Sequence, residues 1–182
     1  MARVALVTGG TRGIGEAICL KLNELGYTVV ANYGGNDQAA QAFTERTGIT
    51  AMKFDVSDFE TTNTAIRQIE NDYGPVEILV NNAGIAVKGG ALDMSVEDFD
   101  RNLAVNLRGA FLVSQAVAKH MVREIEDRDD RSHLSDRPYA IVNMSSINDT
   151  VAIPDYIAYT VSKGGMLQMT RAMALELAPY GI

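Results

Sequence analysis

Short, largely apolar runs alternate with segments of helical period along the whole sequence, and this alternation leaves few folds open. Strands are expected over residues 4–7, 28–31, 50–54, 76–80 and 139–144. Helices are expected over 14–25 and 37–47, from a cap at Ser57 or Asp58 to about Tyr73, from 95 to about 126, and from 154 or 155 to 178. Strands that are apolar on both faces and alternate with helices predict a parallel sheet between helix layers. The expected fold is therefore the doubly wound, Rossmann-type α/β class.

Composition narrows the classes of function. The 182 residues suit one domain, and 16 Lys and Arg against 23 Asp and Glu give a formal net charge of −7. Such a surface repels phosphate backbones, which argues against a nucleic-acid partner. One cysteine and two histidines argue against a disulfide scaffold and predict no metal site. Without a membrane-length apolar stretch or a signal or transit peptide, we expect a soluble, cytoplasmic protein with no membrane partner.

A glycine-rich turn joins the first expected strand to the first expected helix. Its sequence is Thr8-Gly9-Gly10-Thr11-Arg12-Gly13-Ile14-Gly15. Glycines let a backbone approach a ligand closely, and the free N–H groups and dipole of a helix N-terminus favour an anion. In this strand–turn–helix context the pattern predicts a site for the pyrophosphate of a dinucleotide, with a merely tight turn as the alternative.

The end of the second expected strand indicates which dinucleotide is bound. A site for NAD(H) normally places Asp or Glu there to hold the ribose hydroxyls. Tyr33 occupies this place, and the nearest acid is Asp37. Arg12 in the glycine turn can donate to a 2′-phosphate. Both features predict NADP(H), and the alternative for Arg12 is a solvated surface cation.

Three residues near the end of the sequence form a candidate acid–base site. Tyr159 and Lys163 are four residues apart, so they share one face of the last expected helix. A neighbouring ammonium stabilises the phenolate form of a tyrosine, which makes the tyrosine usable in proton transfer. Ser146 follows the strand expected over 139–144, and ligand clefts open at strand ends in such sheets.

With these residues in place, the sequence resembles the short-chain dehydrogenase/reductase family (SDR) along its whole length. The matching positions are the glycine turn, Asp55, Asn81-Asn82-Ala83-Gly84, Asn106, Ser146, Tyr159 and Lys163. The resemblance implies that Tyr159 protonates a substrate carbonyl as hydride arrives from the nicotinamide. Ser146 would hydrogen-bond the carbonyl oxygen, Lys163 would hold the nicotinamide ribose, and Asn106 would hold a water in the proton relay.

The resemblance also completes the expected cofactor site. Asp55 and Val56 would meet the adenine, and Asn82, Ala83 and Gly84 would line the groove. The expected NADP(H)-binding residues are Gly9, Thr11, Arg12, Gly13, Ile14, Gly15, Tyr33, Asp55, Val56, Asn82, Ala83, Gly84, Tyr159 and Lys163.

Within the family, two stretches bear on the substrate. Residues 31–60 look like acetoacetyl-CoA reductases, and residues 159–182 also look like 3-oxoacyl-(acyl carrier protein) reductases and glucose dehydrogenases. We therefore expect NADPH-dependent reduction of a 3-oxoacyl thioester, with Tyr159 as the general acid. Oxidation of a sugar or polyol by the same residues is an alternative.

The end of the sequence adds a third alternative. Family members continue past the Tyr–Lys helix with two more strands and a segment that covers the substrate, whereas this sequence stops at Ile182. We expect a single dinucleotide-binding domain over residues 1–182 that lacks those strands. A non-catalytic fragment that binds NADP(H) is the alternative to an enzyme.

The resemblance further implies a homo-oligomer, a dimer or tetramer, in which the helices that contain Asn106 and Tyr159 pair with their copies. Apolar residues recur on both helices at helical spacing and serve either this interface or the core. They are Leu107, Phe111, Leu112 and Val117, and Met166, Leu167, Met169, Met173 and Leu177. Residues 123–137 are mostly charged, and we expect a solvated loop there, with an inserted lid or a subunit contact near the site as the alternative.

Overall fold

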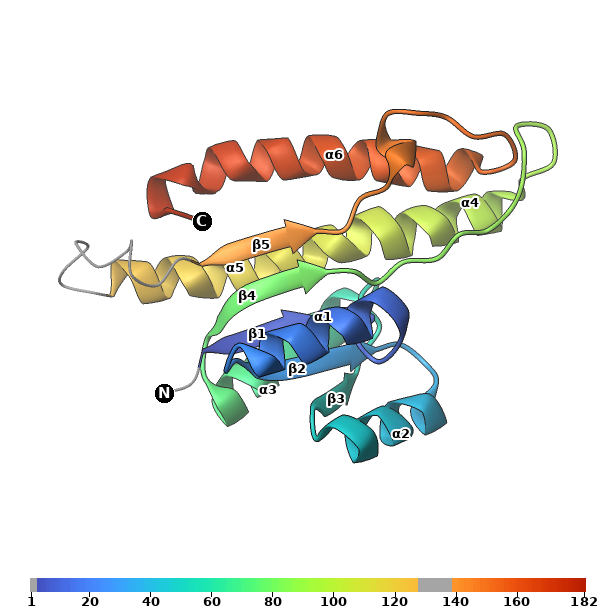
Figure 1. Cartoon of the computed structure of the whole chain (residues 1–182). Coiled ribbons are helices and arrows are strands. Elements are labelled where there is room, and N and C mark those ends of the chain that lie inside the picture. The colour runs from blue at the N-terminus through green and yellow to red at the C-terminus, as the bar shows by residue number, and fades with distance from the viewer. Residues whose placement is uncertain (1–2, 128–138) are drawn as a thin grey trace.

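Five strands form one parallel sheet at the centre of the molecule (Figure 1). The computed structural model describes residues 3–127 and 139–182. The strands are β1 (Val4–Val7), β2 (Thr28–Tyr33), β3 (Thr50–Lys53), β4 (Val76–Asn81) and β5 (Ala140–Asn143), in the order β3-β2-β1-β4-β5. All four pairings are parallel, so the carboxyl ends of all five strands lie on the same side of the sheet. The strand order reverses between β1 and β4, which is where ligand clefts form in this class of fold.

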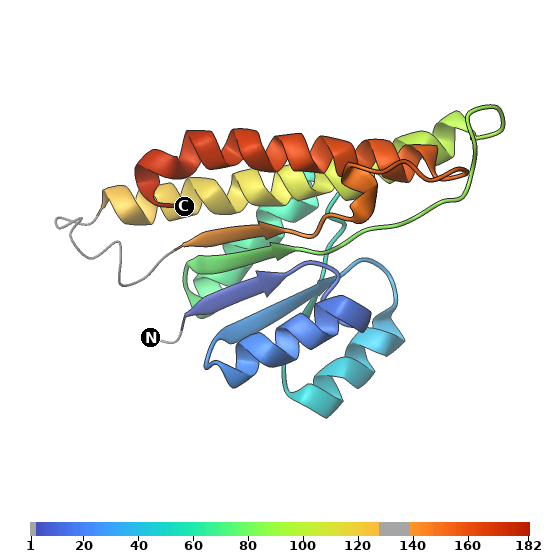
Figure 2. The same cartoon turned by 45° about the horizontal axis from the view of Figure 1, so that its top comes forward.

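Helices cover the sheet, as the sequence predicts for a doubly wound fold. They are α1 (Gly13–Glu24), α2 (Asp37–Thr47), α3 (Phe59–Tyr73), α4 (Val96–Leu103), α5 (Ala110–Glu126) and α6 (Ile157–Leu177). Single 3-10 turns, η3 (Ile147–Asp149) and η4 (Ala178–Tyr180), flank α6. Helices α5 and α6 lie side by side in both views (Figures 1 and 2). In the described part of the chain, no helix is long and apolar enough to cross a membrane.

Each face of the sheet has its own core. Ala5 and Val7 of β1 pack with Phe43 of α2 on one face, and Val4 and Leu6 pack with α3 and α5 on the other. Successive strand residues point to opposite faces. Because all four residues of β1 are buried, this strand has to be apolar at every position.

The expected helix over residues 95–126 is continuous but not uniform. A π-helical segment, η1 (Ala104–Gly109), separates α4 from α5 and contains Asn106. Helix α5 also includes residues 123–126, so the expected loop was wrong there: Ile125 is buried in the core and keeps these residues helical. Residues 128–137 of that expected loop lie outside the described residues.

The last helix begins at Ile157, later than the 154 or 155 that the sequence indicates. Asp155 has a φ of 64°, which lies outside the helical region. Its carbonyl oxygen instead accepts from the Gly89 amide at 2.8 Å, which ties the loop before α6 to the loop after β4. By contrast, α3 is capped as expected, because the Asp58 carboxylate accepts from the Thr61 amide at 2.7 Å.

Candidate active site

The turn after β1 adopts the geometry that its glycines allow. A Cβ at Gly15 would lie 2.1 Å from the carbonyl oxygen of Gly9, so only glycine permits this approach. Arg12 immediately precedes α1, and no side chain caps that helix. The first N–H groups of α1 are therefore available to an anion.

The end of β4 holds this turn in place. The Thr8 hydroxyl oxygen accepts from the backbone amides of Asn82 and Ala83, both at 3.0 Å. The Asn82 side-chain amide donates to the carbonyl oxygens of Thr8 and Gly9, both at 3.1 Å. Asn82 thus supports the glycine turn from behind.

A cleft of about 430 Å³ lies at the edge where the strands end. Of the expected cofactor residues, it brings together Gly9, Thr11, Arg12, Tyr33, Asp55, Val56, Ala83 and Gly84. Gly13, Ile14, Gly15 and Asn82 flank or support the glycine turn and do not line the cleft. Tyr159 and Lys163 lie outside this cleft on α6, and Ser146 lies outside it at the start of η3.

The cleft contains further residues that the sequence analysis missed: Asn32, Gly34, Gly35, Asn36, Ala39, Phe54, Ile85, Arg101 and Val105. Asn32 is a buried polar residue in an otherwise apolar strand, and this departure from the apolar pattern could have marked it as a site residue. Its side-chain oxygen accepts from the Gly9 amide at 3.3 Å, and its nitrogen donates to the Phe54 carbonyl at 2.8 Å. Arg101 and Val105 come from α4 and η1, and no local pattern marks them.

Asp37, the acid nearest to Tyr33 in sequence, is engaged elsewhere. Its carboxylate pairs with the Lys53 ammonium at 2.9 Å. The hydrogen bond from Lys53 lowers the pKa of Asp37. Asp37 is therefore an ionised acid already paired with a cation, and it does not line the cleft.

Asn106 is the centre of a buried polar network. Its side-chain oxygen accepts from the Ile85 amide and its nitrogen donates to the Ile85 carbonyl, both at 2.8 Å. The nitrogen also lies 3.1 Å from the Ser162 hydroxyl and 3.3 Å from the Asn102 oxygen. Ser162 in turn donates to the Tyr159 carbonyl at 2.7 Å. The network links η1 to α6 at the turn that carries Tyr159 and Lys163.

Lys163 is 4% exposed and lies beside Tyr159. Its ammonium is 5.6 Å from the centre of the Tyr159 ring and donates to the Met144 carbonyl at 2.6 Å. Burial lowers the pKa of Lys163, and the charge of Asp149 partly opposes this shift. The α6 spacing therefore sets a cation next to the phenol, as the sequence predicts.

Ser146 caps η3, the short turn that packs against α6. Its hydroxyl oxygen accepts from the Asn148 amide at 3.2 Å. The preceding Ser145 donates to the Asp149 carboxylate at 2.7 Å. Ser146 thus lies on the segment that joins the end of β5 to the helix of Tyr159.

The fold and these residues define a class of protein: a Rossmann-type α/β protein with a glycine turn after its first strand and a buried lysine beside a tyrosine on its last helix. Comparison with known proteins agrees, since the family model described as "short chain dehydrogenase" matches residues 3–182. The chain belongs to the short-chain dehydrogenase family.

Individual relatives are consistent with this assignment. The chain is 43% identical to an acetoacetyl-CoA reductase of Paracoccus denitrificans, over all of this chain and 70% of that protein. It is 34% identical to a 3-oxoacyl-[acyl-carrier-protein] reductase of Staphylococcus aureus, over all of this chain and 71% of that protein. A solved short-chain dehydrogenase from Streptomyces avermitilis superposes with a TM-score of 0.87 at 25% identity, over the whole of this chain and 63% of that one.

Proposed function

We propose that the protein reduces the 3-oxo group of an acyl thioester to a hydroxyl with NADPH, and that Tyr159 is the proton donor. The observation that carries this proposal is the buried Lys163 ammonium beside Tyr159, on the helix against which the Ser146 turn packs. An ammonium at that place favours the phenolate that remains once the proton has left. The Ser146 hydroxyl would donate to the substrate oxygen and hold it in reach of Tyr159.

The residues of the cleft fit a nicotinamide dinucleotide, which supplies the hydride when bound. The glycine turn leaves room for a pyrophosphate, and the uncapped N-terminus of α1 offers it N–H groups. Arg12 lines the cleft as a cation, while the acid nearest in sequence to Tyr33 is paired with Lys53. A 2′-phosphate would meet a cation there and no unpaired acid, which favours NADP(H).

Apolar surface near the acid–base group favours an acyl substrate over a sugar. Ile147, which follows Ser146, is 71% exposed, and Val151 and Ile153 between Ser146 and Tyr159 are also exposed. A sugar needs hydrogen-bond partners around its hydroxyls, whereas an acyl thioester can cover apolar side chains. The names of the two reductases described above point to the same substrate class.

The test is a comparison of substrates and of two tyrosine variants. We expect the protein to oxidise NADPH, followed by absorbance, with acetoacetyl-CoA or a 3-oxoacyl carrier protein, and to leave NADP+ unreduced with glucose. Tyr159→Phe should lower turnover by a factor of about 100 to 10,000, the usual contribution of a general acid. Tyr27→Phe makes the same change away from the cleft and should retain activity. A Tyr159→Phe variant with near-normal turnover would exclude this mechanism.

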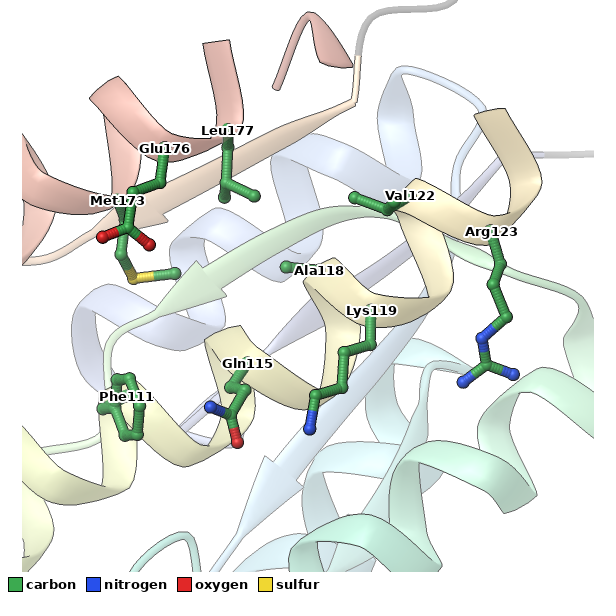
Figure 3. A pocket seen from close by; sticks show the side chains of 9 residues that line it. All are labelled: Phe111, Gln115, Ala118, Lys119, Val122, Arg123, Met173, Glu176 and Leu177. Atoms are coloured by element: carbon green, nitrogen blue, oxygen red, sulfur yellow. The ribbon is translucent and has the colours of Figure 1, made fainter. Parts of the chain in front are cut away.

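We further propose that the protein forms a homo-oligomer through α5 and α6. An open groove of about 430 Å³ runs between these helices (Figure 3). Phe111, Ala118 and Val122 of α5 and Met173 and Leu177 of α6 form its apolar part. The same helices were expected from the family resemblance to pair with their copies.

A further inference from the structure

Two arginines line the cleft at the strand ends, and neither is neutralised. Arg12 precedes α1 and Arg101 lies on α4. Within residues 3–127 and 139–182, the side chain of neither forms an ion pair or a hydrogen bond. Asp55 is the one carboxylate among the described lining residues, and one of its oxygens already accepts from the amide and hydroxyl of Ser57 at 2.8 and 2.7 Å.

The place of Arg101 in the cleft lining is informative because an acid stands one helical turn before it. Glu97 and Arg101 are four residues apart with the acid first, the order that favours pairing on a helix surface. No such pair forms in the described structure, and Arg101 lines the cleft instead. Asn102, the next residue, is fully buried, so the backbone of α4 is fixed at this point.

The balance of charge in the cleft is opposite to that of the whole chain. The formal net charge of the protein is −7, yet the cleft presents two arginines against one carboxylate. A local excess of positive charge in a concave site attracts anions and raises their local concentration. The two cations come from different elements, Arg12 from the glycine turn and Arg101 from α4.

We propose that Arg101 binds a phosphate group of the dinucleotide from the α4 side of the cleft, as a second phosphate contact besides Arg12. This inference rests on the proposed function for the identity of the ligand. A guanidinium is weakly hydrated and can donate two parallel hydrogen bonds to phosphate oxygens, which suits it to this position. Arg101 therefore contributes to affinity for the cofactor and takes no part in proton transfer.

The experiment measures binding by calorimetric titration of NADP+, NAD+ and coenzyme A into four proteins: wild type, Arg101→Gln, Arg101→Lys and Arg171→Gln. Arg171 is an exposed arginine of α6 outside the cleft, so its variant controls for the loss of one positive charge. Arg101→Gln should weaken NADP+ binding by about tenfold at low salt, the size of a charge-assisted hydrogen bond. The loss should shrink at high salt, and Arg101→Lys should retain most of the affinity.

The pattern across ligands identifies the phosphate. Equal losses for NADP+ and NAD+ assign Arg101 to the pyrophosphate, and a loss for NADP+ alone assigns it to the 2′-phosphate. The proposal is overturned if Arg101→Gln binds NADP+ as well as Arg171→Gln does. It is also overturned if Arg101→Lys is as weak as Arg101→Gln, or if only coenzyme A binding falls. The experiment measures cofactor binding and not activity. If NADP+ binding depends on Arg101 but the protein reduces no carbonyl, the proposed function is refuted and this inference still stands.

Discussion

Lys163 combines its proposed chemical role with an unfavourable environment. Its ammonium is nearly buried, and burial lowers its pKa, while the Met144 carbonyl is its nearest acceptor. Lys163→Met should abolish most of the proposed turnover, because Tyr159 loses the adjacent positive charge. The free energy of unfolding should change by less than about 1 kcal/mol, since the lost hydrogen bond is offset by the removal of a desolvated charge. Urea unfolding and NADPH oxidation on one preparation measure both; a loss of several kcal/mol with activity intact would contradict this account.

Gly15 lies where the structure leaves no space for a side chain. An added Cβ would overlap the Gly9 carbonyl and approach the Asn82 side-chain nitrogen to 2.6 Å, and the backbone contact cannot relax cheaply. Gly15→Ala should therefore destabilise the protein by more than about 2 kcal/mol, as overpacked sites do. Gly35→Ala is the matched control, because nothing lies within 4 Å of a Cβ there. Thermal unfolding of the two variants should differ clearly, and equal melting temperatures would show that the turn can rearrange.

The positions of site residues were predictable where those residues directly follow an expected strand. The glycine turn, Asp55 and Gly84 each follow an apolar run, so the rule that clefts open at strand ends places them together. Arg101 could not be found in this way, because its place depends on how α4 packs beyond the end of β4. Asn82 was expected to line the cofactor groove, but it does not line the cleft, and its side chain instead donates to the carbonyl oxygens of the glycine turn.

At the scale of elements, α3 and α5 are joined by a buried pair of titratable side chains. The His120 Nδ1 atom lies 2.5 Å from a Glu70 carboxyl oxygen, and the other Glu70 oxygen is buried without a partner. Burial raises the pKa of Glu70 to about 7, with the charge of Arg123 opposing the shift and that of Glu124 adding to it. Burial lowers the pKa of His120, and the charges of Arg123 and Arg67 lower it further. Both pKa shifts favour the neutral forms, so a protonated Glu70 can donate a hydrogen bond to a neutral His120.

This pair should make stability depend on pH in two opposite ways. The raised pKa of Glu70 contributes stability that is complete below its ordinary value of 4.5 and is lost as the pH rises through about 7. The lowered pKa of His120 contributes stability above its ordinary value of 6.5, which is lost as the pH falls. Glu70→Gln stays neutral, so relative to wild type it should gain about 1 to 2 kcal/mol between pH 4.5 and 7 after solvent screening.

Urea unfolding across that pH range checks this prediction. His120→Asn should show the opposite trend relative to wild type, and Glu126→Gln, an exposed acid on the helix of His120 whose charge does not act on Glu70, should show neither. A Glu70→Gln difference that stays constant with pH would show that Glu70 is ionised in the folded protein.

Element types follow from the sequence more closely than element ends. The period of apolar residues separates strands from helices, because a strand buried on both faces must be apolar throughout. The start of α6 was predicted too early because aspartate is a common helix N-cap residue. Asp155 instead takes a left-handed conformation, and its carbonyl oxygen accepts a hydrogen bond from the Gly89 amide. The π-helical turn at Asn106 had no signal, because it depends on side-chain bonds to Ile85 and Ser162 far along the chain.

At the scale of the whole molecule, the groove between α5 and α6 has the character of a self-complementary surface. Phe111 is 41% exposed at one end of the groove, while Lys119 and Arg123 on α5 and Glu176 on α6 provide charges of opposite sign (Figure 3). In a two-fold pairing, the basic residues of one copy can meet the acidic residue of the other. Apolar burial would supply most of the affinity and the charges would set the register.

Phe111→Glu should therefore dissociate the proposed oligomer, because it places a carboxylate in the apolar part of both copies of the groove. Phe59→Glu is the matched control: Phe59 is 46% exposed on α3 and lies outside the groove. Sedimentation velocity at micromolar concentration should give an oligomer for wild type and Phe59→Glu and a monomer of 19.7 kDa for Phe111→Glu. A monomeric wild type, or a Phe111→Glu variant with the wild-type mass, would show that copies of the chain do not pair through this surface.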